Sequence, residues 1–190
     1  NKYRLPDTID VENIVEEKRS PYGLRTYVSL FSSAGVGCYG FKEEGFYCIA
    51  TVELLERRLK IQKFNNKCAY NSGYICGDMT SQETKDKVFA ELDLWKNAFN
   101  VNDLDVLIAT PPCQGMSVAN HKKKDELKRN SLVVESIKMV DAIKPKFFIF
   151  ENVRAFLKSI CTDVDGKDRT IKEAIELNLG GKYNILYRVV

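Results

Sequence analysis

The sequence predicts an α/β fold, in which a mostly parallel sheet carries helices on both faces. Short apolar runs rich in β-branched and aromatic residues alternate along the chain with segments of helical composition, and strands that alternate with helices form parallel sheets. Several of these runs are followed directly by glycine, acidic or proline residues. In open α/β sheets, ligands bind outside the carboxyl ends of the strands.

Composition fits a single globular domain. The chain has 190 residues, 44% of them hydrophobic, and a formal net charge of +3, which neither requires nor excludes a nucleic-acid partner. Its six cysteines are widely spaced and form no CxxC pair, and we expect neither a signal peptide nor a membrane span. This favours a reducing, cytoplasmic setting. The single histidine, His121, disfavours a histidine-rich metal site.

The first strand opens the domain. We expect residues 1–26 to form an arm of unknown role and residues 27–190 to form the domain. An apolar strand at 27–31 leads into a small-residue turn at 32–37, and a short helix follows at 38–44. This order is typical of the opening of a Rossmann-like unit, where a ligand approaches the backbone closely. A plain tight turn is an equal alternative.

Acidic residues follow the next two strands. The strand at 46–52 ends on Glu53, before a helix at 54–64, and the strand at 73–76 is followed by Asp78. Glu53 is placed either to accept hydrogen bonds from ribose hydroxyls or to favour the dipole of the helix. Asp78 either meets the base or amino group of a nucleoside-type ligand or is an ordinary turn residue.

The longest helix carries an apolar stripe. We expect it to begin at a cap formed by Thr80 or Ser81 and to run to about Phe99. The stripe has helical spacing and therefore belongs to the core rather than to a site. Its members are Val88, Leu92, Trp95 and Phe99.

A strand at 104–109 feeds two prolines and Cys113. The prolines fix their own φ angles and favour extended backbone before them, so the thiol sits on a stiff stalk at a strand end. It is either a nucleophile or a small buried residue. The loop at 118–130 follows, with five lysines and arginines against two acidic residues. It either contacts phosphates or is a solvated connection.

The remainder continues the alternation. Ser131 is expected to cap a helix at 132–143, and a buried strand at 146–150 carries Glu151 at its carboxyl end. A turn at Gly166, a helix at 170–178 ended by two glycines and a last strand at 183–190 complete the pattern.

Four blocks resemble, in order, those of the cytosine-C5 DNA methyltransferase family. The Pro-Cys-Gln block followed by Glu-Asn-Val after an apolar strand is the most specific part, and the likeness covers about residues 27–190. It implies a Rossmann-like fold that binds S-adenosylmethionine, with its domain incomplete at the C-terminus. The blocks are Phe31-Ser32-Ser33-Ala34-Gly35-Val36-Gly37, Gly77-Asp78-Met79-Thr80, Pro111-Pro112-Cys113-Gln114-Gly115-Met116-Ser117 and Glu151-Asn152-Val153.

The resemblance implies a set of cofactor contacts. The turn from Phe31 to Gly37 would line the methionine end of S-adenosylmethionine, Glu53 would hold the ribose, and Leu54 would lie against the adenine. The remaining positions would frame the adenine, line the pocket floor or lie near the cofactor. They are Asp78, Met79, Thr110, Pro112 and Leu132.

It also implies the chemistry. The thiolate of Cys113 would add to C6 of a cytosine flipped out of the duplex, so that C5 can attack the methyl group. Glu151 would act as an acid at N3, which requires crowded, dry surroundings, and Asn152 would support the turn. The basic loop resembles a mobile catalytic loop that closes over DNA. The candidate DNA contacts are Gln114, Ser117, Lys122, Lys123, Lys124, Lys128 and Arg129.

Departures from the family pattern restrict the expectation. Ser33 and Val36 stand where the family commonly has glycines, and the family's target-recognition region and C-terminal blocks are not in this sequence. We therefore expect a methyltransferase of restriction-modification type that is inactive as this fragment alone and needs further chain or a second chain carrying the recognition domain. Its partner would be double-stranded DNA, in the nucleoid if the source is bacterial, with S-adenosylhomocysteine as a product and no metal. The alternatives are a tRNA cytosine-5 methyltransferase and a non-catalytic cofactor- or partner-binding module.

Overall fold

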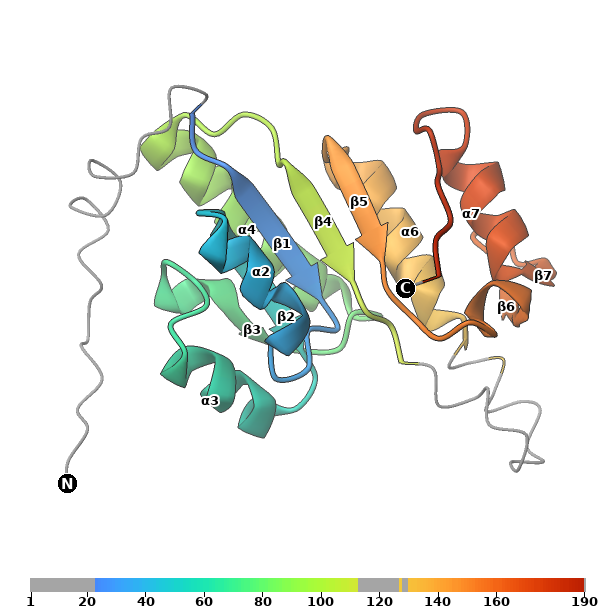
Figure 1. Ribbon diagram of the computed structural model, residues 1–190, viewed down its shortest axis with the longest axis horizontal. Coiled ribbons are helices and arrows are strands. Elements are labelled where there is room, and N and C mark those ends of the chain that lie inside the picture. The colour runs from blue at the N-terminus through green and yellow to red at the C-terminus, as the bar shows by residue number, and fades with distance from the viewer. Residues whose placement is uncertain (1–22, 113–126, 128–129, 190) are drawn as a thin grey trace. The chain divides into compact units, whose positions relative to one another are not determined.

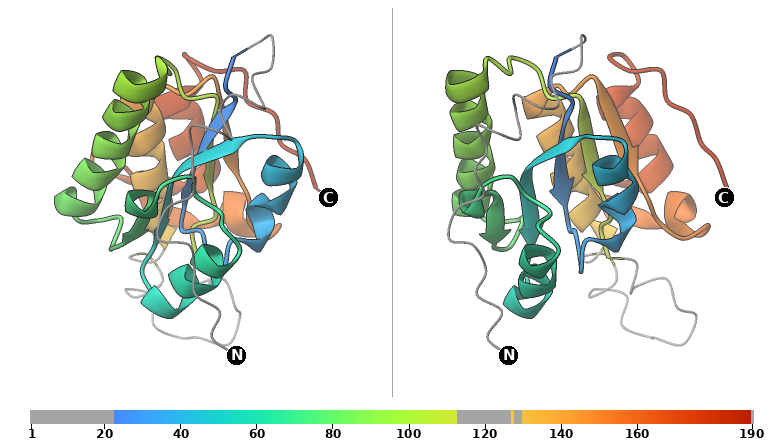
Figure 2. Two further views of the ribbon diagram at one scale, coloured as in Figure 1. Left: turned by 90° about the vertical axis from the view of Figure 1, so that its left-hand side faces the viewer. Right: turned by 60° about the vertical axis from the view of Figure 1, so that its left-hand side comes forward.

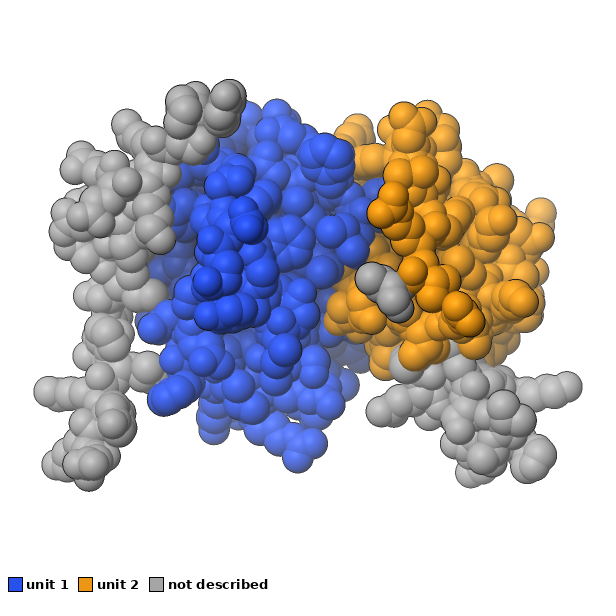
Figure 3. Space-filling view, in the orientation of Figure 1, with its two compact units in different colours: residues 1–108, 145–149 blue, residues 109–144, 150–190 orange. Residues whose placement is uncertain are grey.

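The computed structural model describes residues 23–112, 127 and 130–189. The chain divides into two compact units, which Figure 3 distinguishes by colour. Unit 1 consists of residues 1–108 and 145–149, and unit 2 consists of residues 109–144 and 150–190. No helix in the described ranges is long and apolar enough to cross a membrane.

Unit 1 is built on a five-stranded sheet with the strand order β3-β2-β1-β4-β5. β1 pairs with β2, and β2 with β3, in parallel. The amides of Phe147 and Glu151 donate to the carbonyls of Asp105 and Ala109 with one constant offset, so β5 also runs parallel to β4. In Figure 1 the arrows of β1, β4 and β5 point the same way. The strands are β1 (Thr26–Leu30), β2 (Tyr47–Glu53), β3 (Tyr74–Cys76), β4 (Val106–Ala109) and β5 (Phe147–Phe150).

Helices follow each of the first three strands, as the sequence predicts. α2 and α4 lie on opposite faces of the sheet (Figure 2). α2 ends before Gly45, whose φ of 74° reverses the chain into β2. The helical segments are η1 (Val36–Cys38), α2 (Tyr39–Glu43), α3 (Glu56–Phe64), η2 (Asn71–Gly73) and α4 (Gln82–Phe99).

The predicted apolar face of α4 is confirmed as core at two of its four members, and the other two are half-buried. Val88 and Trp95 are fully buried, and Trp95 packs against the rings of Tyr47, Tyr70 and Phe99. Four aromatic rings therefore fasten this helix to the start of β2 and to the segment before η2, which fixes the position of β3.

Unit 2 contains a hairpin that the sequence analysis did not predict. The strands β6 (Ile160–Thr162) and β7 (Asp168–Thr170) are antiparallel, and Gly166 supplies the left-handed residue of their turn with φ 79°. The buried carboxylate of Asp163 accepts hydrogen bonds from Arg169 and Asn178. The other elements are α6 (Leu132–Ile143), η3 (Phe156–Lys158) and α7 (Ile171–Leu179).

Both helices of unit 2 lie close to where they were predicted, but only α7 has a side-chain cap at its first turn. α7 begins with a capping box in which Thr170 and Glu173 exchange side-chain and backbone hydrogen bonds. Ser131 does not cap α6, because its hydroxyl donates to the Leu127 carbonyl and accepts from the Thr162 amide. Ser81 likewise makes no side-chain cap at the start of α4.

Two strand predictions need correction. The strand at 146–150 was expected to be buried, but β5 is the last strand in the sheet order, and Phe147 and Ile149 are 67% and 42% exposed. They share one side of the strand because side chains alternate along it. The run at 183–190 was expected to be a strand, yet residues 183–189 form none. An extended apolar run becomes a strand only when it pairs with a neighbour, and Leu186 is 85% exposed.

We expect Trp95→Ala to lower the free energy of unfolding by about 3–5 kcal/mol, because it leaves a large cavity among the rings that hold α4. Urea denaturation followed by circular dichroism measures this change. The matched control is Phe64→Ala, in which a ring that is 69% exposed is removed, with an expected change within about 0.5 kcal/mol. Equal effects of the two substitutions would show that α4 is not fastened through Trp95.

Candidate functional site

The carboxyl ends of the first three strands are joined to one another in unit 1. The Ser32 amide donates to the Val52 carbonyl at 3.0 Å, and the Gly77 amide donates to the Glu53 carbonyl at 3.1 Å. The turn after β1, the end of β2 and the turn after β3 therefore lie together. This edge holds the residues that the sequence analysis assigned to the cofactor in this unit, which are Phe31 to Gly37, Glu53, Leu54, Asp78 and Met79.

Glu53 is the most heavily bonded residue of this edge. Its side chain is 5% exposed. One carboxylate oxygen accepts from the Ser33 amide at 2.8 Å, and the other accepts from the Leu55 amide at 3.1 Å and from Arg58 at 3.3 Å. An ionised carboxylate offers about four acceptor positions, and these bonds occupy three of them. The bond to Leu55, at the start of α3, also fits the alternative in which Glu53 serves the helix.

The turn after β1 has left-handed backbone at three positions. Phe31, Ser33 and Gly35 have φ angles of 53°, 50° and 85°. A Cβ at Gly35 would lie 3.0 Å from Cγ of Gln62, so both the backbone and the space favour glycine there. Ser33, one of the two departures from the family pattern, is held on both sides: Glu53 accepts from its amide, and Gln62 donates to its carbonyl at 2.5 Å.

The other positions of this edge are open to solvent to different extents. Val36, the second departure, is 79% exposed and Leu54 is 61% exposed, whereas Met79 is buried. Asp78 is exposed, and its Oδ1 atom accepts from the amide and the hydroxyl of Thr80 at 2.8 and 2.9 Å. In this structure Asp78 thus stabilises its own turn, and the exposed Leu54 offers an apolar surface that suits an aromatic ring.

The Pro-Pro segment is held in unit 2 by the turn after β5. The Glu151 amide donates to the Ala109 carbonyl at 3.1 Å, and the Asn152 side chain donates to the Pro111 carbonyl at 2.7 Å. Its Oδ1 atom also accepts from the Val153 amide at 2.9 Å. The expectation that Asn152 supports this turn is confirmed. Proline has no backbone N–H to donate, so the backbone of the two prolines can be held by hydrogen bonds only through their carbonyls.

Glu151 itself is exposed. The crowded surroundings that the sequence analysis expected around it are therefore not made by the described residues. Thr110 and Pro112 are half-buried, and Leu132, at the start of α6, is also half-buried. The other predicted site residues lie outside the described residues; they are Cys113, Gln114, Ser117, Lys122, Lys123, Lys124, Lys128 and Arg129.

The sequence analysis did not identify Gln62 and Arg58, two residues of α3 whose side chains hydrogen-bond to the turn after β1 and to Glu53 at the end of β2. Gln62 is 1% exposed and lies three residues after the buried Leu59. A helix presents residues three apart on one face, so the spacing placed this amide on the buried face of α3. A glutamine on such a face needs partners for its polar atoms, and that was the available signal.

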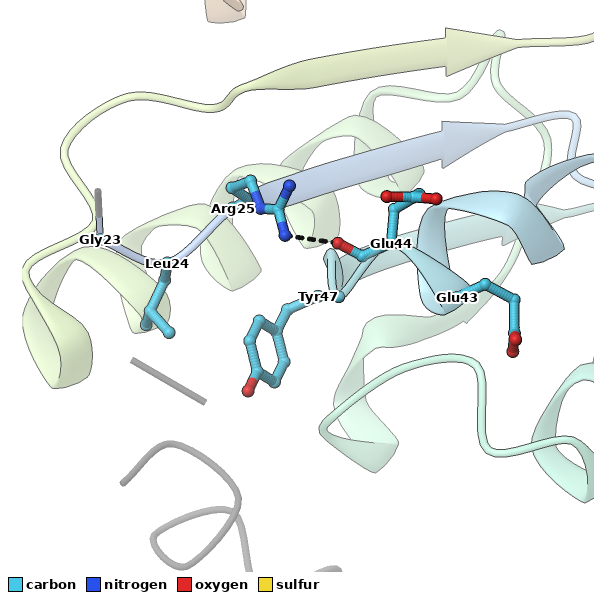
Figure 4. A pocket seen from close by; sticks show the side chains of 7 residues that line it. Gly23, Leu24, Arg25, Glu43, Glu44 and Tyr47 are labelled. Atoms are coloured by element: carbon cyan, nitrogen blue, oxygen red, sulfur yellow. Dashed lines mark hydrogen bonds between the residues drawn. The ribbon is translucent and has the colours of Figure 1, made fainter. Parts of the chain in front are cut away.

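Two surface hollows lie away from these residues. One, of about 330 Å³, is lined by residues near the amino ends of β1 and β2, where Arg25 donates to the Glu44 carbonyl (Figure 4). The other, of about 720 Å³, lies beside β7 and α7 in unit 2. Among the described residues, no group of three or more histidine, cysteine or acidic side chains is placed to hold a metal ion.

The chain is similar to bacterial DNA methyltransferases along most of its length. It is 34% identical over 168 residues to the Type II methyltransferase M1.HgaI of Avibacterium volantium, covering 86% of this chain and 44% of that protein. It is 32% identical to the Type II methyltransferase M.XorII of Xanthomonas oryzae pv. oryzae, covering 86% and 35%. The chain thus spans less than half the length of either relative.

The fold has a counterpart among solved structures. A putative DNA modification methyltransferase encoded within an Escherichia coli prophage superposes with a TM-score of 0.55 at 22% identity, over 85% of this chain and 39% of that one. This likeness supports the Rossmann-like methyltransferase fold. Residues 25–189 match the family model described as C-5 cytosine-specific DNA methylase, and the chain therefore belongs to the C-5 cytosine-specific DNA methylase family.

Proposed function

We propose that this chain is the part of a DNA (cytosine-5)-methyltransferase that binds the methyl donor and carries the nucleophile. The single observation that carries the proposal is the pair of bonds from Glu151 and Asn152 to Ala109 and Pro111. They hold an acid-bearing turn against the stalk that leads directly to Cys113. The relatives named as Type II methyltransferases support a restriction-modification setting.

The cofactor edge of unit 1 fits S-adenosylmethionine. Glu53 has one acceptor position left for a ribose hydroxyl, and Leu54 offers exposed apolar surface for the adenine. The left-handed turn from Phe31 to Gly37 brings backbone close to the methionine end. Asp78 and Met79 would frame the base. The remaining residues that the resemblance assigns to the cofactor are Thr110, Pro112 and Leu132. When bound, S-adenosylmethionine supplies an electrophilic methyl group and leaves as S-adenosylhomocysteine.

Cys113 and Glu151 would carry the chemistry on the base. The Cys113 thiolate forms a bond to C6 of cytosine, which makes C5 electron-rich. Glu151 donates a hydrogen bond or proton to N3 and so accepts the charge that this addition creates. After methyl transfer, a base removes the C5 proton, the Cys113 thiolate leaves C6, and any proton that was given to N3 returns to Glu151, which restores the aromatic ring. Because Glu151 is exposed in the described chain, the bound base and the residues around Cys113 would have to enclose it.

The substrate we propose is a cytosine flipped out of double-stranded DNA, because the thiol cannot reach C6 inside a stacked duplex. The basic residues from Lys122 to Arg129 would contact phosphates. Target selection would reside in a recognition region outside this sequence, on the same chain or on a second one. The matching family model is described as a DNA methylase, which favours DNA over the tRNA alternative.

We expect the full-length or reconstituted enzyme to form a covalent adduct with DNA that contains 5-fluorocytosine, in the presence of S-adenosylmethionine. Fluorine at C5 prevents the final elimination, so the Cys113–C6 bond persists and a gel shift that survives denaturation measures it. Cys113→Ser should abolish the adduct while cofactor binding persists. An adduct with tRNA but not with DNA would overturn the proposed substrate, and an adduct that survives Cys113→Ser would overturn the assigned nucleophile.

We expect Asn152→Ala to lower kcat by about tenfold, because the lost hydrogen bond no longer holds the Pro-Pro segment in place. Loss of a hydrogen bond of this kind costs roughly 1–3 kcal/mol. The dissociation constant for S-adenosylmethionine should stay unchanged, since the hydrogen bonds of the turn after β1 come from other residues. The control Asn102→Ala removes an exposed amide that donates to Asn100, and it should leave both values unchanged. An unaltered kcat in Asn152→Ala would argue against a positioning role for this bond.

A further inference from the structure

One buried side chain links the cofactor turn to α3. Gln62 is 1% exposed. Its Nε2 group donates to the Ser32 hydroxyl at 2.9 Å and to the Ser33 carbonyl at 2.5 Å, and its Oε1 atom accepts from the Thr51 hydroxyl at 2.7 Å. The amide is thus bonded at both ends, as a buried polar group requires.

The Ser33 carbonyl fixes which way this amide points, and a lysine completes the chain of donors. Lys67 donates to the Thr51 hydroxyl at 3.0 Å, and an ammonium group can only donate. The Ser33 carbonyl can only accept, so the Gln62 atom that faces it is the nitrogen, and the atom that faces Thr51 is the oxygen. The Thr51 hydroxyl, which accepts from Lys67, gives its own proton to that oxygen. It follows that the NH₂ group of Gln62 faces the turn, and the donors of Lys67, Thr51 and Gln62 all run toward Ser33.

Ser33 needs this support. A residue with a Cβ at φ 50° pays a conformational cost that glycine does not pay. Glu53 fixes the peptide before Ser33 through its amide, and Gln62 fixes the peptide after it through its carbonyl. Strained backbone of this kind persists only where its surroundings determine it from more than one side.

We infer that Gln62 is a positioning residue for the methyl donor, holding the turn after β1 in the shape that receives S-adenosylmethionine and allowing a serine to stand at its left-handed position. The inference rests on the proposed function, because it assumes that this turn binds the donor. Gln62 does not touch the reacting atoms. It keeps Ser33 in its left-handed conformation before the donor binds. The turn then needs no ordering on binding, which would otherwise weaken the affinity for the donor.

The test replaces Gln62 by methionine, which keeps the length and approximate volume of the side chain and removes its hydrogen bonds. In Gln62→Met, calorimetry should show S-adenosylmethionine binding weakened roughly tenfold to a hundredfold, while kcat at saturating donor changes little. Hydrogen exchange at the Ser33 and Gly35 amides of the cofactor-free protein should accelerate. Gln82→Met makes the same change at an exposed glutamine that contacts Asp86 and should affect none of these values.

Rescue separates positioning from general stability. Adding Ser33→Gly to Gln62→Met removes the conformational cost at this position and should restore most of the lost donor affinity. Should Gln62→Met fail to fold, Gln62→Glu serves instead: it keeps the acceptor for Thr51 and sets a second oxygen against the Ser33 carbonyl, so the same loss of affinity and the same rescue are expected.

The outcomes are distinct. A folded Gln62 variant that bound S-adenosylmethionine as tightly as the wild type would overturn the inference and leave the proposed function standing. Weakened binding that Ser33→Gly does not restore would also overturn it, because the effect would then be one of stability alone. If the wild-type full-length enzyme bound no S-adenosylmethionine at all, both the inference and the proposed cofactor would fail.

Discussion

The hydrogen bonds of the Glu53 carboxylate hold together the edge of the sheet at the carboxyl ends of β1, β2 and β3. This carboxylate is nearly buried and accepts hydrogen bonds from the turn after β1, from the backbone that starts α3 and from Arg58. A buried charge is tolerated only when donors replace the water that it has lost. Each of these donors therefore stabilises the charge, and the charge in turn fixes the strand end, the glycine-containing turn and the helix relative to one another within unit 1. An anionic group that is already this well bonded has little freedom to rearrange when a ligand arrives.

Polar bonds of the same kind organise both units. In unit 1, Gln62 and Glu53 hydrogen-bond to the two peptide groups of Ser33. In unit 2, Asn152 donates a hydrogen bond to the carbonyl of Pro111. In each case a side chain at or after a strand end, or on the following helix, holds backbone whose own geometry is restricted. Apolar packing, such as that around Trp95, positions the elements, whereas these few directed bonds set the shape of the loops at their ends.

Most of the helices and strands could be predicted from the sequence, because hydrophobic periodicity and the positions of glycine and proline are local signals. The alternation of strands and helices, the stop at Gly45 and the apolar face of α4 are all present in the structure. The errors concern properties that depend on neighbours: β5 was expected to be buried, and the run at 183–190 was expected to pair. Resemblance supplied the candidate site residues, but the roles of Gln62 and Arg58 depend on which face of α3 meets the turn. That is a tertiary fact, and single-residue patterns did not reveal it.

The bond between Asn152 and Pro111 spans 41 residues of sequence, and this separation has a consequence for the order of events during synthesis. The Pro-Pro segment leaves the ribosome well before the Asn152 amide that binds it. Contacts distant in sequence form after local ones, because the intervening chain must first be ordered. The turn after β1 draws its partners from the 30 or so residues that follow it, so this turn can be completed early. A nascent chain would therefore form the turn after β1 before the residues that follow β5 can hold the Pro-Pro segment.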